Sequence, residues 1–322
     1  MTVRNGEAYL SECLDSILNQ SIQDWELCVV NNQSSDATGK ILEKYHLLDQ
    51  RVNVVDYKGV SEIIPALRAA YKASSGDYIT RMDADDLMPK EKLCFLRDEL
   101  LKKGRGFVAT GLVHYFSNTE LGDGYKKYET WLNELTQHSS NYSQIYKECV
   151  IPSPCWMVHH DDFEKCGAFS SDVYPEDYDL CFRFYENNMK VIGINEVLHY
   201  WRDYNNRNSR TDPNYADQLF FDLKLHYFLK VDHKVNLPLI VWGAGRKGKL
   251  MAKKLIDLKL QFDWVTDNPK KIGHNIYGII LKNVDLINYG KQAQVIVAIS
   301  GEEQSNVIRF LEQRKVKYYL FC

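Results

Sequence analysis

Three carboxylates fall within four positions of the stretch Arg81-Met82-Asp83-Ala84-Asp85-Asp86, directly after the strand-like residues 77–80. Like charges placed this close repel one another unless a cation lies between them. Hard oxygen ligands favour Mg²⁺ or Mn²⁺, and the spacing of Asp83 and Asp85 lets them share one divalent ion with a diphosphate. The stretch also fits a solvated turn before a helix that Pro89 opens. Alone, it leaves both interpretations open.

The elements that must position this stretch alternate between helices and strands. Apolar spacing predicts helices over about 7–19, 36–47, 61–72 and 89–103, and strands over 25–30, 52–55, 78–82 and 107–116. This alternation predicts an α/β fold with a mostly parallel sheet and helices on both faces. Ligands of such sheets bind beyond the carboxyl ends of the strands, where residues 31–36 and 83–86 both lie.

The length of 322 residues predicts two domains. We expect a first domain over residues 1–230, a linker over 231–236 and a smaller Rossmann-like α/β domain over 237–322. A helix from about residue 215 to 229 would close the first domain.

The second domain carries a glycine pattern after its first strand. Gly243, Gly245 and Gly248, with Asp267 about twenty residues on, fit the fingerprint of a dinucleotide site. This second nucleotide site would support an oxidoreductase or modifying enzyme that uses NAD(P) or a nucleotide sugar. The domain is only half of a dinucleotide-binding fold, and such glycines also serve tight packing of a strand on a helix. A structural role therefore stays open.

Composition excludes several classes of protein. A net charge of −3 gives no basic stripe for nucleic acid, and no apolar run approaches the ~18 residues of a transmembrane span. The eight cysteines form no Cys-x-x-Cys pair and indicate a reducing compartment. We expect a cytoplasmic location. The lysine pairs at 102–103 and 126–127 could contact the inner face of a membrane, or they could simply be solvated surface residues.

The first domain resembles a family 2 glycosyltransferase of the GT-A fold over roughly residues 1–210. The blocks that carry the resemblance are, in order, Thr2–Leu10, Leu14–Ser21, Asn31–Thr38, Arg81–Asp86, Pro175–Leu180 and Trp201–Arg202. The acidic block matches the family motif nearly letter for letter. Blocks in the expected order are far more specific than any one of them.

The resemblance implies metal-dependent, inverting transfer of a sugar from a nucleotide diphosphate to a hydroxyl. Asp85, with Asp83 nearby, would hold Mg²⁺ or Mn²⁺ against the leaving diphosphate, and Asp83 could instead touch the ribose. Asp177 would be the base that takes the acceptor proton, with Glu176 as the alternative. Both acids also suit a helix N-terminus. Arg202 would contact the diphosphate.

Nucleotide recognition follows from the same resemblance. The backbone of Thr2 and Val3, the neighbouring Arg4, and the side chain of Asn31 or Asn32 would meet the base and ribose. The family commonly has Asp where this chain has Asn, but an amide oxygen can still accept from the uracil N–H. A UDP-sugar is therefore the expected donor, with the base open.

Two other departures concern the phosphate end. Pro65 stands where many relatives carry an Arg-Asn pair, so Arg68 is an alternative source of charge and otherwise a surface residue. Tyr204 takes the place of a family His, which would leave Arg202 to act alone.

A glycan or lipid-linked acceptor would meet a pocket at Pro154 and Trp156, because an aromatic face suits sugar C–H stacking; Trp156 could equally be core. His159 and His160 are adjacent, point to different sides and should not share a metal. The family's first strand should precede Thr2, so we expect the natural protein to start upstream or the sequence to be truncated. Bacterial surface glycan synthesis is the implied role, and an inactive sugar-binding scaffold is the remaining alternative.

Overall fold

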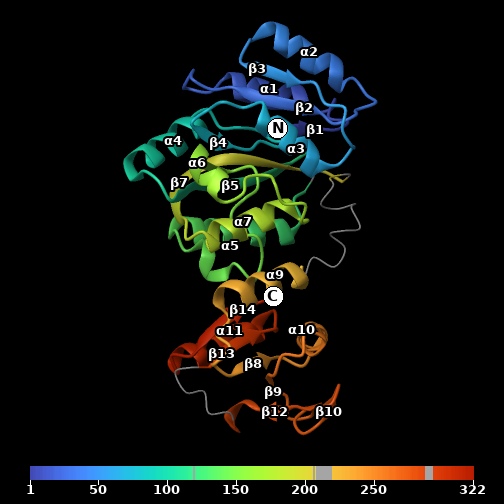
Figure 1. Ribbon diagram of the computed structural model, residues 1–322, viewed down its shortest axis with the longest axis vertical. Helices are drawn as coiled ribbons and strands as arrows, with labels where there is room; N and C mark the ends of the chain where they lie inside the picture. Colours follow the sequence, from blue (N-terminus) through green and yellow to red (C-terminus); the bar gives the residue numbers. More distant parts are fainter. Residues whose placement is uncertain (119, 206, 208–219, 287–292) are drawn as a thin grey trace. The chain divides into compact units, whose positions relative to one another are not determined.

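The computed structural model describes residues 1–118, 120–205, 207, 220–286 and 293–322 (Figure 1). It divides into two compact units, one of Met1–Ser143 with Cys149–Asp212, the other of Gln144–Glu148 with Pro213–Cys322. Within the described residues, no helix is both long enough and apolar enough to cross a bilayer.

Residues expected to end the first domain belong to the second unit instead. Helix α9, Phe221–Tyr227, and the π-helical turn η3, Phe228–Asp232, both lie in it. The reason is aromatic packing, because the ring of Tyr146 in the short segment lies 5.7 Å from Phe228. Residues 215–219 of the expected helix lie outside the described part of the chain.

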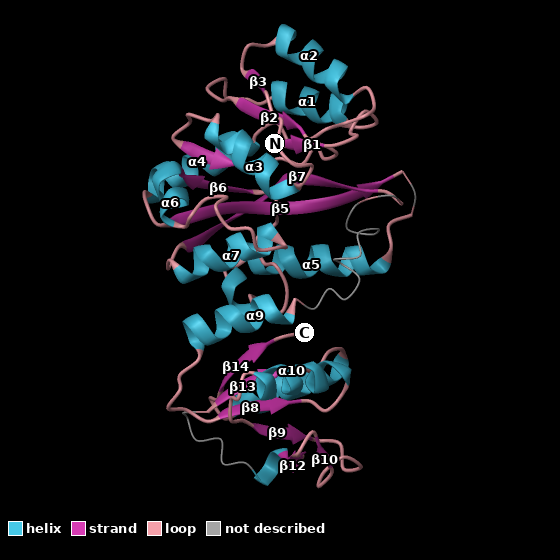
Figure 2. Ribbon diagram, turned by 45° about the vertical axis from the view of Figure 1, so that its right-hand side comes forward, coloured by secondary structure: helices cyan, strands magenta, loops and turns pink. Residues whose placement is uncertain are grey.

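The first sheet of the first unit is parallel and has the order β1-β2-β3 (Figure 2). Its strands are β1 (Thr2–Val3), β2 (Leu27–Asn31) and β3 (Val52–Val55). Helices α1 (Leu10–Leu18) and α2 (Thr38–Leu48) connect these strands, and α3 (Ile63–Lys72) follows β3 and leads to the next sheet. The three helices and strands β2 and β3 lie where the apolar spacing predicts them, whereas β1 was not among the predicted strands.

The second sheet has the order β4-β6-β5-β7. Its strands are β4 (Tyr78–Thr80), β5 (Phe107–Ser117), β6 (Trp156–His159) and β7 (Lys190–Asp203). Its helices are α4 (Lys92–Lys103), α5 (Asp123–Gln137), the short η1 (Asn141–Gln144), α6 (His160–Lys165) and α7 (Glu176–Glu186). Strand β6 runs antiparallel to both neighbours, while β5 and β7 are parallel. The predicted α/β class is confirmed, with this one antiparallel strand in the sheet.

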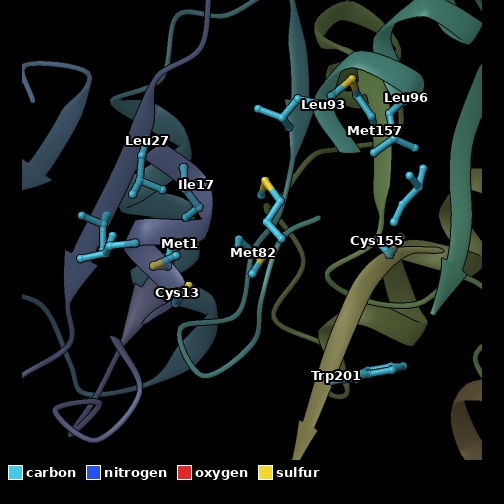
Figure 3. Close-up of a cluster of buried hydrophobic side chains, with 14 of the residues drawn as sticks. Met1, Cys13, Ile17, Leu27, Met82, Leu93, Leu96, Cys155, Met157 and Trp201 are labelled. Carbon is cyan, nitrogen blue, oxygen red and sulfur yellow. The ribbon is translucent and has the colours of Figure 1, made fainter. Parts of the chain in front are cut away.

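One apolar core joins the two sheets of the first unit. Figure 3 shows side chains from α1, β2, α4, β6 and β7 meeting in it, including Cys13, Leu27, Leu96, Met157 and Trp201. Burying a large apolar side chain stabilises a fold by roughly 1.5–3 kcal/mol. This core therefore holds the carboxyl ends of strands from both sheets at fixed distances from one another.

The sheets do not share a strand among the described residues, and β1 pairs only with β2. A cavity of about 540 Å³ lies between β2 and β4, with Leu27, Ile79 and Met157 among its lining residues. The cavity is separate from the three carboxylates of the acidic stretch, none of which lines it.

The second unit is built on a parallel sheet of order β12-β9-β8-β13-β14. Its strands are β8 (Leu239–Trp242), β9 (Asp263–Thr266), β12 (Lys282–Asn283), β13 (Gln294–Val297) and β14 (Lys317–Leu320). The helices α10 (Arg246–Asp257) and α11 (Glu302–Gln313), the hairpin of β10 (Asn275–Ile276) with β11 (Ile279–Ile280) and the turn η4 (Val284–Leu286) complete it. The sheet and its two longer helices form a small Rossmann-like unit.

Close packing explains one glycine of the predicted fingerprint. A Cβ atom added at Gly248 would lie 1.9 Å from the carbonyl oxygen of Gly243, whereas one added at Gly245 would meet no atom within 4 Å. Gly248 therefore lets α10 approach the end of β8, and Gly245 has no such constraint.

We expect Gly248→Ala to lower the free energy of unfolding of the second unit by about 1–3 kcal/mol, the typical cost of overpacking. Gly245→Ser is the matched control, because Gly245 is the residue before α10 and serine is a good residue at that position. Urea unfolding followed by circular dichroism measures both. Equal stability of the two variants would contradict the packing role.

Candidate active site

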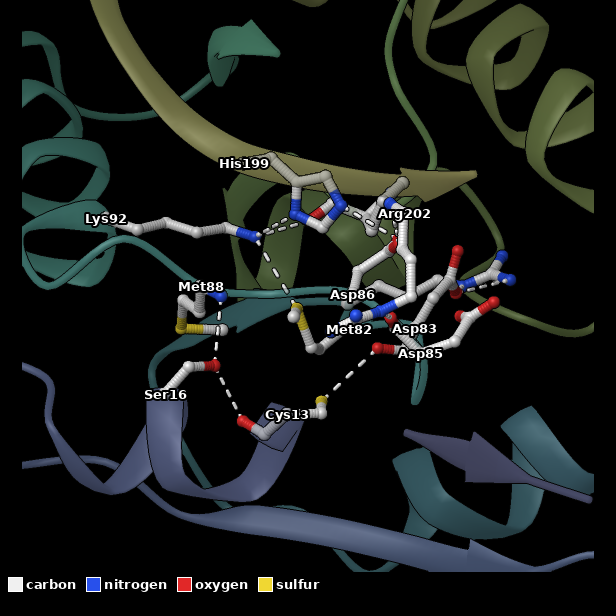
Figure 4. Close-up of polar contacts among 12 residues, drawn as sticks. Cys13, Ser16, Met82, Asp83, Asp85, Asp86, Met88, Lys92, His199 and Arg202 are labelled. Carbon is white, nitrogen blue, oxygen red and sulfur yellow. Dashed lines mark hydrogen bonds and ion pairs between the residues drawn. The ribbon is translucent and has the colours of Figure 1, made fainter. Parts of the chain in front are cut away.

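The acidic stretch forms the turn at the carboxyl end of β4 (Figure 4). It is fixed to β7, since the backbones of Leu87 and Tyr200 exchange two hydrogen bonds of 3.1 Å. The thiol of Cys13 on α1 donates to the carbonyl of Asp83 at 3.4 Å. Segments far apart in the sequence therefore hold this turn in place.

Arg81 is the buried cation of the turn, with 9% of its side chain exposed. Its guanidinium lies 3.2 Å from Asp83 and 2.8 Å from Glu176, the first residue of α7. Burial works against its charge, but Asp83, Glu176 and Asp177 outweigh that effect and raise the pKa of Arg81. One arginine thus ties the acidic turn to the two acids of α7.

The two candidate bases have different surroundings. Glu176 is 7% exposed and accepts a hydrogen bond from Arg81. Asp177 is less buried, and desolvation of its carboxyl together with the charge of Glu176 raises the pKa of Asp177 to about 7. A group that titrates near neutral pH suits proton transfer. The geometry therefore favours Asp177 as the base and gives Glu176 a structural partner.

Asp85 carries the other perturbed carboxyl of the turn. Burial and the neighbouring charges of Asp86 and Asp83 raise the pKa of Asp85 to about 6. The hydroxyl of Tyr204 donates to Asp85 Oδ2 at 2.9 Å. Tyr204 therefore contacts the turn, and contact of Arg202 alone with the diphosphate stays a prediction.

Arg202 is held beside the turn from several sides. Its Nε donates to the carbonyl of Asp85 at 2.7 Å, and a terminal nitrogen donates to Glu12 at 2.6 Å. The guanidinium also lies over the rings of Tyr9 and Phe116, at 4.5 and 4.7 Å from their centroids. These contacts fix a cation next to the expected position of the diphosphate.

The chemistry of the turn fits a divalent cation. Asp83 is disposed to be ionised, because Arg81 and Arg207 lower its pKa despite burial. The pKa of Asp85 is about 6 in the folded chain, against 3.8 for an ordinary Asp. Between about pH 4 and 6 the folded chain therefore keeps a proton on Asp85 that the unfolded chain has lost. The free energy of unfolding consequently falls as pH rises through this window. A cation bound to the ionised pair would offset that loss.

The set of donors fits the metals predicted. No group of three or more His, Cys, Asp or Glu that could hold a metal occurs in the described part of the chain. The protein would therefore offer the carboxylates of Asp83 and Asp85, and phosphate and water would supply the other oxygens. Mg²⁺ and Mn²⁺ bind in this way, through one or two carboxylates and a substrate phosphate.

The expected nucleotide residues gather at the ends of β1 and β2. Thr2 and Val3 pair with Val30 and Asn31 in parallel register. The side chain of Asn31 accepts from the backbone of Ser34 at 3.1 Å, so this residue shapes the turn after β2. Arg4, the next residue after β1, is exposed.

Asn32 has an unsatisfied acceptor. The residue is 6% exposed and its amide nitrogen donates to the carbonyl of Glu62 at 3.2 Å, whereas its Oδ1 is buried without a hydrogen-bond partner. A buried acceptor left unpaired costs roughly 1–3 kcal/mol. The free oxygen thus offers one acceptor at the expected base site.

The expected acceptor pocket is filled by core packing. Trp156 is 2% exposed, and its ring lies 5.5 Å from that of Phe163 and 5.8 Å from that of Phe184. This is the alternative that the sequence left open, and Trp156 has no free aromatic face for a sugar. Pro154 is buried as well, and its carbonyl accepts from Lys92 at 2.6 Å.

Other singled-out side chains have structural partners. His159 accepts from the backbone of Asp161 and caps α6, while His160 lies 3.2 Å from the hydroxyl of Tyr71. The two histidines therefore do not converge. Arg68 donates to the carbonyl of Phe169 at 2.9 Å, which fixes a loop instead of supplying charge at the turn.

Sequence reasoning missed two residues at the site, Lys92 and His199. Both are fully buried, and His199 Nε2 lies 3.0 Å from Asp86 while Lys92 lies 3.3 Å from His199 Nδ1. The available signal was the position of Lys92, which shares the apolar face of its helix with Leu96 and Leu100 at four-residue spacing.

The candidate second nucleotide site lies in the other unit. Gly243 and Gly245 lie in the loop that joins β8 to α10, Gly248 lies in the first turn of α10, and Asp267 directly follows β9 and is exposed. Lys271 Nζ donates to the carbonyl of Ala244 in this loop at 3.0 Å. A nucleotide at this loop stays a prediction.

The buried pairs of Arg81 yield a stability prediction. Arg81→Met leaves Glu176 and Asp83 without their cation, so we expect the free energy of unfolding to fall by about 3–5 kcal/mol. Arg105→Met is the control, because the Arg105–Asp161 pair is 49% and 68% exposed and solvent screening leaves such a pair little effect on stability. Urea unfolding at pH 7.5 compares them. A similar small loss in both variants would contradict the role given to Arg81.

Comparison with known proteins gives a family match. The model of "Glycosyl transferase family 2" matches residues 1–167, more than half of the chain. Glycosyltransferase GlyA of Streptococcus pneumoniae is 27% identical over 62% of this chain and 29% of that protein. The putative teichuronic acid biosynthesis glycosyltransferase TuaG of Bacillus subtilis is 26% identical over 70% of this chain and 87% of its own length.

Chondroitin synthase of Pasteurella multocida is 35% identical over 97% of this chain but only 33% of that protein. The chain thus spans about a third or less of the length of two of these relatives.

Two solved structures share the fold. Residues 1–349 of Staphylococcus aureus TarS, in complex with UDP-GlcNAc, give a TM-score of 0.53 at 18% identity, over 72% of this chain and 66% of that one. A mannosyltransferase of Pyrobaculum calidifontis, in complex with GDP-Man and Mn²⁺, gives 0.52 at 17% identity, over 72% and 63%. With the family match, these likenesses show that the chain belongs to glycosyltransferase family 2 and has the GT-A fold.

Proposed function

We propose that the protein is a metal-dependent, inverting glycosyltransferase that moves a sugar from a nucleotide diphosphate to a hydroxyl. The observation that carries the proposal is the position of Arg81. Its guanidinium contacts Asp83 in the acidic turn and Glu176 beside Asp177. Arg81 therefore joins the pair of carboxylates suited to bind a cation to the helix end that carries a separate carboxyl suited to proton transfer.

The two groups of carboxylates divide the work of transfer. Asp85 and Asp83 would hold Mg²⁺ or Mn²⁺, which when bound neutralises charge on the departing diphosphate. Arg202 adds a fixed cation at the same end. Asp177 accepts the proton of the acceptor hydroxyl as that oxygen bonds to the sugar. One base opposite the leaving group gives a single displacement with inversion.

A UDP-sugar is the proposed donor. Asn32 Oδ1 is a buried acceptor without a partner, and uracil carries an N–H in its ring that could donate to it. The amide nitrogen of Asn32 already donates to Glu62, which leaves only the oxygen for the base. One similar structure holds UDP-GlcNAc and another GDP-Man, and guanine also carries a ring N–H.

The acceptor is proposed as a glycan or a lipid-linked glycan of a bacterial surface. This rests on relatives whose names concern teichuronic acid and chondroitin synthesis. All eight cysteines are free thiols, which supports the proposed location in a reducing compartment such as the cytoplasm, with contact at the inner face of a membrane as a further prediction.

Metal dependence is tested by hydrolysis or transfer with a panel of UDP-, GDP- and dTDP-sugars. We expect activity with Mn²⁺ that a chelator abolishes and fresh Mn²⁺ restores. Asp85→Asn should lower the rate by about 100-fold or more, since the cation contributes several kcal/mol. Asp98→Asn is the control at an exposed carboxyl outside the site. A rate that is unchanged in excess chelator would overturn the proposal.

The role of Asp177 predicts a pH profile. Because the pKa of Asp177 is about 7, we expect kcat/KM to rise with pH up to about 7 and level off above it. Asp177→Asn should lower the rate by roughly 10²–10⁴ and remove the inflection. Glu176→Gln should move the inflection to lower pH, because the charge of Glu176 raises the pKa of Asp177. An unchanged profile in Asp177→Asn would assign the base to another group.

The role of Asn32 is tested by binding of nucleotides without a sugar. Cytosine has no proton on the ring nitrogen where uracil carries one, so we expect UDP to bind at least about tenfold more tightly than CDP. Asn32→Leu should remove this preference while the diphosphate contacts persist. Isothermal titration with Mn²⁺ present measures both nucleotides. A preference that survives in Asn32→Leu would place base recognition elsewhere.

A further inference from the structure

A chain of buried polar groups runs from α4 to the acidic turn (Figure 4). Lys92 Nζ lies 3.3 Å from His199 Nδ1, and His199 Nε2 lies 3.0 Å from Asp86 Oδ2. All three side chains are fully buried. Lys92 and His199 lie outside the sequence blocks that resemble the family. Asp86 lies in the acidic block but is neither an expected cation ligand nor the expected base. The proposed reaction therefore leaves this chain of groups unexplained.

The two contacts of His199 set its tautomer when Lys92 carries its charge. An ammonium group only donates, so in that state His199 Nδ1 accepts from Lys92 and the ring proton sits on Nε2. His199 Nε2 then donates to Asp86. Lys92 also donates to the carbonyl of Pro154 at 2.6 Å and lies 4.0 Å from the sulfur of Met82. A neutral imidazole thus connects a lysine cation to an aspartate without contact between the two charges.

The second oxygen of Asp86 carries the chain of contacts onward. Asp86 Oδ1 accepts from the backbone N–H of Arg202 at 2.8 Å. The side chain of Arg202 in turn donates to the carbonyl of Asp85. Asp86 therefore fixes the backbone of Arg202. Through the side chain of Arg202 it also fixes Asp85, the residue expected to bind the metal.

We propose that Lys92 and His199 are positioning residues for the cation and diphosphate end of the site, acting through Asp86. The inference rests on the proposed function for the identity of that ligand. Groups behind a metal ligand orient it, and their loss commonly lowers metal affinity or activity roughly 10–100-fold. Burying three ionisable groups is costly, and apolar residues would often stabilise a core as well, so fold stability alone is a weak reason for this arrangement.

The geometry also explains why histidine suits the central place. The ring offers an acceptor to Lys92 and a donor to Asp86 at once. A glutamine amide also has one acceptor and one donor, whereas alanine has neither. Comparing His199→Gln with His199→Ala therefore separates the hydrogen-bond relay from the mere presence of a buried side chain.

The experiment uses the full chain with UDP and Mn²⁺ as probes. Wild type, His199→Ala, His199→Gln and Lys92→Met are compared by isothermal titration and by Mn²⁺ dependence of the rate. Asn141→Ala is the matched control, because Asn141 is also fully buried and donates to Thr136 and Val150 away from the site. Thermal unfolding of each variant records its stability.

We expect His199→Ala and Lys92→Met to weaken Mn²⁺-dependent UDP binding roughly 10–100-fold, and His199→Gln to recover most of it. The control should lose thermal stability while keeping wild-type binding. Nitrogen NMR of labelled histidine should show His199 as a neutral ring with its proton on Nε2, and Lys92→Met should change that signal.

The inference is overturned if His199→Ala binds UDP and Mn²⁺ like wild type, or if His199→Gln recovers nothing. If His199→Gln fails to fold, Lys92→Met decides the matter, and the inference is overturned if that variant binds UDP and Mn²⁺ like wild type. The binding and NMR results do not depend on turnover. A chain that binds UDP with Mn²⁺ but transfers no sugar would contradict the proposed function and leave this inference standing.

Discussion

Repulsion among three carboxylates in one half-buried turn is the constraint around which the first unit is built. Each carboxylate has a different partner. Asp83 faces the guanidinium of Arg81, Asp85 accepts from Tyr204, and Asp86 accepts from a buried imidazole. Burial and like charge raise the pKa of Asp85 to about 6, although the charge of Arg207 works against this rise. The protein itself compensates the negative charge of these carboxylates only in part. A bound divalent cation would compensate the rest.

The topology brings those partners together from distant parts of the chain. Strand β4 ends at the turn, α7 places Glu176 beside Arg81, and β7 supplies Arg202. Pairing of β5 with β7 shifts register between Gly111 and Val113. Because a slip of one residue in a strand moves its side chains to the other face, these shifts help determine which residues of β7 face Asp86.

Local patterns were sufficient to predict much of this arrangement. Strand β3 occupies its predicted range, and the acidic stretch lies at the carboxyl end of β4 as parallel topology requires. Residue type alone did not reveal that Arg81 joins the turn to α7, because that contact spans 95 positions in the chain. Burial decided the case of Trp156, whose ring packs in the core although its type equally suits a sugar pocket.

Sequence reasoning missed Lys92 and His199 for a related physical reason. A lysine or histidine is usually solvated, and only the tertiary fold shows that these two share one buried relay. The second unit gives a parallel lesson, since the glycine pattern has two physical explanations. Packing accounts for Gly248, whose Cβ would overlap the backbone of Gly243. Its agreement with a nucleotide fingerprint is therefore weak evidence for a ligand.

A crystal structure of the chain with UDP and Mn²⁺ is the most direct test of the central claim. Anomalous scattering at the manganese edge locates the ion without assumptions about its ligands. The account predicts a peak at about 2.0–2.2 Å, a typical metal–carboxylate distance, from an oxygen of Asp85 and shared with the diphosphate. A bound diphosphate without a metal peak, or a peak away from the turn after β4, would contradict it.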